Sequence, residues 1–97
     1  MTDTGIKEQV LCEISELAKK YDVKKVVLFG SRARGDYHKK SDIDLAVYGG
    51  NITEFALGVD EDTSTLLSYD IVDMEKEHQK KFKDAIIREG IVIYEKV

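Results

Sequence analysis

The stretch from residue 25 to residue 48 reads KVVLFGSRARGDYHKKSDIDLAVY, and its two apolar ends decide the fold that we predict. Residues 25–29 form a short β-branched and aromatic run that stops at Gly30, which is typical of a buried strand followed by a turn. In residues 41–48 polar and apolar residues alternate at first, and the run ends at two glycines. This pattern predicts a second strand that leaves a solvent-facing site and enters the core.

The spacing of apolar residues outside this stretch predicts the remaining elements. Helical periodicity predicts helices over residues 6–21, 52–59 and 74–89, whereas short apolar runs predict strands over residues 66–72 and 91–94. This order predicts an α/β (α+β) fold in which helices pack on one small mixed sheet of about four strands. Because 97 residues leave room for one core, we expect a single domain over residues 1–97.

Charge is distributed unevenly along the chain. The net charge of −4 argues against a general nucleic-acid coat, because such binding depends on Lys and Arg that neutralise phosphates. Residues 19–40 nevertheless hold eight Lys or Arg against Asp22 and Asp36, a local net charge of +6 that surrounds one loop. Residues 54–77 are mostly acidic, and we interpret most of these carboxylates as a solvated face.

Several classes of protein are excluded by what the sequence lacks. No run approaches the roughly 18–20 consecutive apolar residues of a membrane span. The first residues also lack the basic and apolar regions of a signal peptide, so we expect a cytoplasmic protein. Cys12 is the only cysteine, which excludes an intrachain disulfide. His38 and His78 have no His or Cys partner at ligand spacing, and we interpret both as surface residues.

Two short motifs within residues 25–48 suggest chemistry. A glycine after a buried strand lets the backbone approach a ligand, and the Ser31 that follows Gly30 offers an amide and a hydroxyl to phosphate oxygens. Asp42 and Asp44 are two residues apart on a predicted strand, so both carboxylates face the same side. Divalent cations would offset their repulsion, although an isolated Asp-x-Asp is more often a pair of exposed aspartates at a strand edge.

The combination of these motifs is more specific than either alone. GSRARGD at residues 30–36, followed by SDIDL at residues 41–45, resembles the signature of the polymerase-beta-like nucleotidyltransferase superfamily, in particular its minimal branch, MNT. The resemblance implies that Gly30 and Ser31 grip a nucleoside triphosphate. It also implies that Asp42 and Asp44 hold two divalent ions, Mg²⁺ or Mn²⁺.

The same resemblance implies a third carboxylate from a neighbouring strand. Asp70 matches the acidic residue that opens an apolar pair in the family, and it would bind the catalytic metal and deprotonate the nucleophile; Asp73 is the competing candidate. Arg32 and Arg34 could neutralise phosphate, or they could form a surface pair with acidic partners.

The resemblance also implies a partner and a reaction. Stand-alone MNT proteins resemble antitoxins that pair with an all-helical HEPN toxin and transfer AMP from ATP to a tyrosine of that toxin. We therefore expect a metal-dependent nucleotidyltransferase that acts on a hydroxyl of a partner HEPN protein. One alternative is a non-catalytic antitoxin that neutralises the toxin by contact alone. The other is a nucleotidyltransferase that acts on RNA, with the basic residues 19–40 contacting phosphates.

Overall fold

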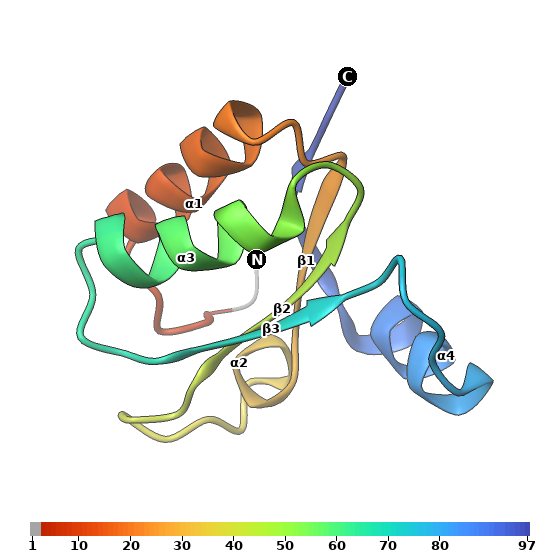
Figure 1. Cartoon of the computed structure of the whole chain (residues 1–97). Helices are drawn as coiled ribbons and strands as arrows, with labels where there is room; N and C mark the ends of the chain where they lie inside the picture. Colours follow the sequence, from red (N-terminus) through yellow and green to blue (C-terminus); the bar gives the residue numbers. More distant parts are fainter. Residues whose placement is uncertain (1–2) are drawn as a thin grey trace.

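The computed structural model describes residues 3–97 and contains there four strands and four helices (Figure 1). In chain order they are α1 (Glu8–Lys20), β1 (Lys25–Phe29), α2 (Ser31–Arg34), β2 (Ile43–Tyr48), α3 (Ile52–Asp62), β3 (Tyr69–Asp73), α4 (Lys80–Glu89) and β4 (Ile91–Glu95). The strands form one mixed sheet flanked by helices, which confirms the predicted α/β (α+β) fold.

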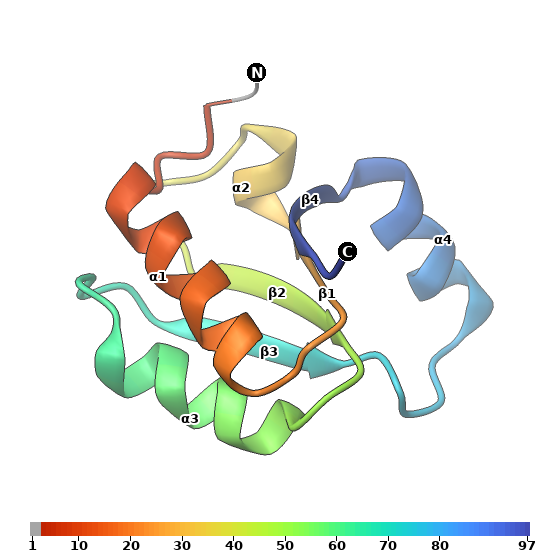
Figure 2. The same cartoon turned by 90° about the horizontal axis from the view of Figure 1, so that it is seen from above.

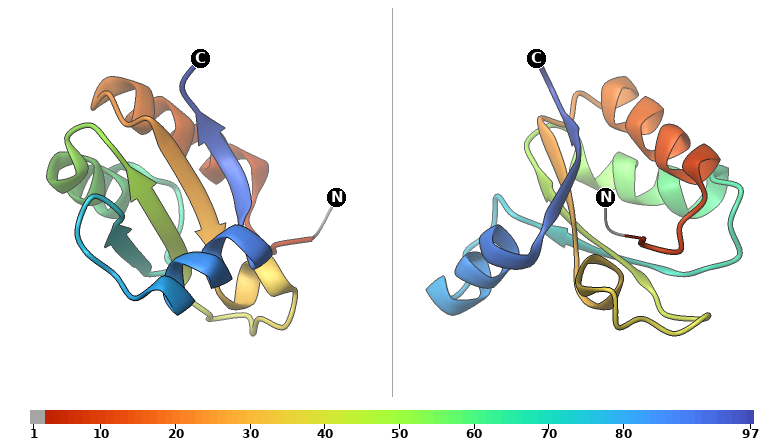
Figure 3. Two further views of the ribbon diagram at one scale, coloured as in Figure 1. Left: turned by 90° about the vertical axis from the view of Figure 1, so that its right-hand side faces the viewer. Right: turned by 180° about the vertical axis from the view of Figure 1, so that it is seen from behind.

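The order of strands in the sheet is β3-β2-β1-β4, so β3 and β4 form its two edges (Figure 3). β1 is antiparallel to both β2 and β4, whereas β2 and β3 are parallel because α3 crosses over between them. The register pairs Phe29 of β1 with Asp44 of β2, and Asp44 in turn with Asp70 of β3. Phe29, Asp44 and Asp70 therefore lie next to one another on three neighbouring strands, at one end of the sheet.

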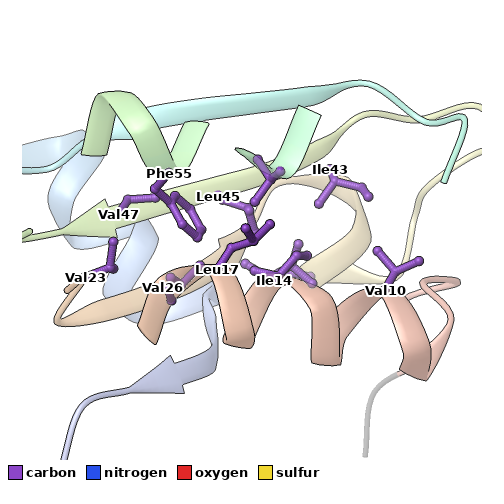
Figure 4. Close-up of a cluster of buried hydrophobic side chains, with 13 residues drawn as sticks. Val10, Ile14, Leu17, Val23, Val26, Ile43, Leu45, Val47 and Phe55 are labelled. Atoms are coloured by element: carbon purple, nitrogen blue, oxygen red, sulfur yellow. The ribbon is translucent and has the colours of Figure 1, made fainter. Parts of the chain in front are cut away.

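One face of the sheet is covered by α1 and α3 (Figure 2). Alternate residues of β2 point into this core, where Ile43, Leu45 and Val47 are fully buried with Phe55 of α3 (Figure 4). α1 contributes its predicted apolar stripe, and its buried residues are Val10, Ile14, Leu17 and Ala18. No helix within residues 3–97 is long and apolar enough to cross a membrane.

The opposite face of the sheet is covered only in part, by α4. A smaller cluster there joins Val27 of β1, Ala46 of β2 and Ile86 of α4. The ring of Phe82 in α4 meets Phe29 edge-on, with ring centroids 5.8 Å apart. Phe29 pairs with Asp44, so the part of the sheet that α4 covers extends to the neighbourhood of the aspartates.

Element boundaries differ from the prediction where polar side chains bind the backbone. The helix predicted over residues 74–89 begins only at Lys80, because the Asp73 carboxylate accepts the Glu75 N–H and holds a turn in place of a helix start. The strand predicted from residue 66 begins at Tyr69, since Leu66 is fully exposed in the preceding loop. The predicted turn at Gly30-Ser31 opens the four-residue helix α2, which was not predicted.

Candidate active site

The carboxylates of Asp44 and Asp70 lie side by side on the face of the sheet away from the main core. The two residues are register partners in the parallel pair of β2 and β3. Their side chains share one face because Ile43 and Leu45, the neighbours of Asp44, point into the core on the other. Asp73 is three residues from Asp70, so its side chain lies on the α3 side of the sheet. The structure thus brings Asp70, and not Asp73, to Asp44.

The pKa of the Asp44 carboxyl is affected by the charged groups around it. Partial burial raises the pKa of the Asp44 carboxyl, and the negative charges of Asp70 and Asp42 raise it further. A hydrogen bond to Asp70, possible only when one of the two carboxyls is protonated, acts in the same direction, whereas the positive charge of Arg34 lowers the pKa. Two further carboxylates and one guanidinium therefore lie close enough to act on Asp44 at this end of the sheet.

Gly30 is positioned against the same carboxylate. It ends β1 with φ of +75°, a conformation that side chains rarely adopt. A Cβ atom at this position would lie 2.3 Å from Oδ2 of Asp44, so only glycine leaves room for the aspartate. Ser31 follows Gly30 directly and is the first residue of α2.

The structure buries Arg32, which disfavours the expectation that it binds phosphate and contradicts the alternative that it forms a surface pair. Its side chain is 1% exposed. The guanidinium donates hydrogen bonds to the carbonyl oxygens of Thr4 at 2.9 Å, Ser41 at 3.1 Å and Lys39 at 3.4 Å, and it stacks on the ring of Tyr37. Each of its three nitrogens donates to a backbone carbonyl, so Arg32 braces the loop that leads into β2.

Arg34, two residues later, lies at the surface near the acidic cluster. Its Nε donates to Oδ2 of Asp36 at 3.3 Å, and its Nη1 lies 3.7 Å from Oε2 of Glu89 at the end of α4. These carboxylates raise the pKa of Arg34, whose charge also acts on Asp44. With its side chain 44% exposed, Arg34 can exchange these partners for phosphate.

The basic segment of residues 19–40 is divided by the fold. Lys24 and Lys25 lie at the start of β1, where the ammonium of Lys25 covers the ring of Tyr48 at 5.7 Å. Lys39 and Lys40 are exposed in the loop before Asp42, at the other end of the sheet. The strand β1 lies between the two groups and is roughly 13 Å long at about 3.3 Å per residue. Only the second group adjoins the acidic cluster.

Comparison with known proteins identifies the family. Residues 12–97 match the family model described as polymerase beta nucleotidyltransferase. The chain belongs to this family. It is therefore a nucleotidyltransferase, as the motifs at residues 30–45 predicted.

One curated relative and two solved structures are similar to this nucleotidyltransferase. It is 38% identical over 92 residues to "Putative protein adenylyltransferase MJ0604" of Methanocaldococcus jannaschii, covering 84% of this chain and 90% of the relative. A crystal structure of a toxin-antitoxin with AMP-PNP shares the fold, with a TM-score of 0.67 at 23% identity over 89% of this chain and 73% of the other. A mutant of the toxin-antitoxin MntA-HpeT shares it too, with a TM-score of 0.66 at 21% identity over the same shares of both chains.

The donor atoms of the nucleotidyltransferase site fit a hard divalent cation. Asp42, Asp44 and Asp70 offer carboxylate oxygens alone, which Mg²⁺ and Mn²⁺ prefer. His38 is exposed, and the half-buried His78 packs on Phe82 with its Nε2 2.8 Å from the Asp73 carbonyl oxygen, so neither adds nitrogen to the set. Within residues 3–97 no three acidic, His or Cys side chains form a ready-made site for one ion. Further oxygen ligands, such as those of a triphosphate, would have to complete the coordination.

Proposed function

We propose that this nucleotidyltransferase is a metal-dependent protein adenylyltransferase that moves AMP from ATP to a tyrosine hydroxyl of a HEPN toxin and so acts as its antitoxin. The observation that carries the proposal is the Asp44–Asp70 register pair, fitted against Gly30 on the open end of the sheet. The name of the Methanocaldococcus jannaschii relative and the toxin-antitoxin structures with the same fold support the class of acceptor and of partner.

The residues of the chain divide the work as follows. Gly30 and Ser31 bind the triphosphate, and Arg34 turns from Glu89 toward a phosphate oxygen. The acceptor oxygen attacks the α-phosphorus, the bond from that phosphorus to the bridging oxygen of the β-phosphate breaks, and pyrophosphate leaves. Asp70 takes the proton of the attacking hydroxyl.

Asp42, Asp44 and Asp70 would hold two Mg²⁺ or Mn²⁺ ions together with oxygens of the triphosphate, because these ions prefer carboxylate and phosphate oxygens as ligands. When bound, such ions supply positive charge to the attacking and leaving oxygens. The chain contributes the fixed position of these carboxylates, which follows from the pairing of β2 with β3. It also contributes the brace of Arg32, which holds the loop before Asp42.

The experiment is a transfer assay with a candidate HEPN toxin as acceptor, Mg²⁺ and ATP labelled in the α-phosphate. Label should move to a tyrosine of the partner with the wild type, and Asp44→Ala or Asp70→Ala should abolish transfer while the complex still forms. Glu16→Ala is the matched control, because Glu16 is an exposed carboxylate of α1 on the other face of the sheet, and it should leave transfer intact.

Two other results would replace the proposal. Equal silencing of the toxin by wild type, Asp44→Ala and Asp70→Ala, without any label on the partner, would establish an antitoxin that works by contact alone. Label on RNA in place of the protein would establish an RNA-directed enzyme, in which Lys39 and Lys40 would supply the phosphate contacts next to the site.

A further inference from the structure

The outer side of β3 is open to a further strand. β3 is an edge of the sheet and pairs only with β2. The Met74 N–H donates to the Val47 carbonyl, and because backbone groups alternate along a strand, those of Asp70 also point toward β2. The N–H and C=O groups of Tyr69 and Ile71 therefore point away from the sheet, and no residue within 3–97 pairs with them. Unpaired edges of this kind are templates for strand addition.

An apolar groove runs beside this edge, on the α3 side of the sheet. The hollow of about 560 Å³ lies between Ile52, Ala56 and Leu57 of α3 and the side chains of Tyr69 and Ile71. Leu57 is 52% exposed, so its side chain is accessible to a partner that enters the groove. Figure 2 shows α3 lying alongside β3 over its length. Side chains of an added strand that point to this side would enter the groove.

The charge of the groove rim selects the kind of segment that it fits. α3 contains four acidic residues, Glu54, Asp60, Glu61 and Asp62, and no Lys or Arg. Asp60 and Asp73 line the groove itself, where Lys76 is the one basic residue. Opposite charge favours and orients association at such a rim. The residues that the sequence indicated as a solvated acidic face therefore complement a basic segment.

We propose that an extended, basic segment of the acceptor protein adds to the free edge of β3 and presents its acceptor tyrosine beside Asp70. The inference rests on the proposed function in that it takes the acceptor to be a protein. Adjacent strands lie about 4.8 Å apart, so the residue opposite Asp70 has its Cβ within roughly 5.5 Å and projects on the same face as Asp44. Its two neighbours in the segment project on the other face, into the groove. One strand thus supplies backbone pairing, apolar anchors and the acceptor together.

The test uses a nine-residue peptide in which a central tyrosine alternates with valine and threonine between terminal lysines, so that valines occupy the groove side. The control peptide has the same composition with its valines grouped at one end. In ¹⁵N NMR spectra of the full chain, the alternating peptide should shift the amides of Tyr69, Ile71 and Leu57, and the grouped peptide should shift them far less.

Variants of the chain test the same docking through kinetics. Leu57→Ser removes an apolar contact and Asp60→Lys reverses a rim charge, and each should raise the KM for the alternating peptide about tenfold without changing the KM for ATP. Ile87→Ser is the matched control, since Ile87 is an exposed aliphatic residue of α4 and does not line the groove. It should change neither constant.

The outcomes separate this inference from the proposed function. If Asp44→Ala abolishes labelling of a protein acceptor but the alternating peptide leaves the β3 and α3 amides unshifted, edge docking is wrong and adenylyl transfer stands. If those amides shift as expected but no tyrosine is labelled in peptide or protein, the edge docks a segment and the proposed reaction is wrong. Equal KM values for wild type, Leu57→Ser and Asp60→Lys would also overturn the docking.

Discussion

Changing each arginine of the Arg-x-Arg motif to methionine should have a different effect: Arg32→Met should lower the stability of the fold, whereas Arg34→Met should weaken the binding of MgATP. Methionine keeps much of the aliphatic volume and removes the guanidinium, so each substitution tests the donors of that side chain. At Arg32 it leaves three part-buried carbonyl oxygens without their donors, those of Thr4, Lys39 and Ser41. At Arg34 it removes only ion pairs of a side chain that is 44% exposed.

The expected cost of Arg32→Met follows from this count. An unsatisfied buried acceptor costs about 1–3 kcal/mol, and the lower end applies because removing a buried charge returns part of its desolvation cost. Three acceptors then cost about 3–4 kcal/mol. For a chain of this size, where 1 kcal/mol shifts Tm by about 4–8 °C, Arg32→Met should lower Tm by roughly 12–30 °C. Exposed ion pairs contribute less than about 1 kcal/mol, so Arg34→Met should lower Tm by a few degrees at most.

Urea and thermal unfolding followed by circular dichroism would measure both changes, and titration calorimetry with MgATP would measure binding at a temperature where both variants are folded. Arg34→Met should weaken MgATP binding with stability nearly unchanged. Arg32→Met should lose stability first, with weaker binding only through the loop before β2. Loss of MgATP binding in a fully stable Arg32→Met protein would refute the structural role given to Arg32.

Three further outcomes follow from the acidic cluster. In thermal melts at pH 7 without divalent ions, Asp44→Asn should have a higher Tm than the wild type. The pKa of Asp44 is raised in the folded protein, so ionisation of its carboxyl destabilises the fold at any pH above the pKa of the unfolded chain, near 3.8. The gain in Tm should vanish at pH 3, where the carboxyl is protonated in both states. MgATP should raise Tm of the wild type and of Asp73→Asn but not of Asp44→Asn, and equal shifts in all three would contradict the placement of the site. Gly30→Ala should lower Tm and abolish MgATP binding in calorimetry, because its Cβ would collide with Asp44.

The sequence predicted the parts of the site that depend on local spacing. The period of two in a strand predicts that Asp42 and Asp44 share one face. In the structure β2 begins only at Ile43, so Asp42 lies just before the strand, where its negative charge helps to raise the pKa of Asp44. The parallel pairing that brings Asp70 opposite Asp44 does not follow from spacing, and here the resemblance to a family supplied the expectation. In the structure the odd separation between Asp70 and Asp73 turns the two carboxylates to opposite faces of the sheet.

The misplaced residues depend on contacts between distant segments. Arg32 is buried because the Thr4 carbonyl, 28 residues away, comes to its guanidinium, and no local pattern indicates that approach. The basic segment is continuous in the sequence, but it includes the strand predicted at residues 25–29, and β1 places Lys24 and Lys25 at the far end of the sheet from Lys39 and Lys40. The late start of α4 reflects one side chain, Asp73, which binds the backbone more favourably than a helix does there.

The buried arginine and the crowded aspartates place charge in this small protein in opposite ways. The positive charge of Arg32 is surrounded by backbone carbonyls and uses no carboxylate, so the acidic residues nearby stay free for other partners. Partial burial and then the repulsion of Asp70 and Asp42 raise the pKa of Asp44, so its negative charge lowers the stability of the empty fold. Cations that enter with a triphosphate would remove this repulsion, and a ligand that binds only the folded state stabilises it. Relief of the repulsion at Asp44, which destabilises the empty protein, would therefore add to the free energy of nucleotide binding.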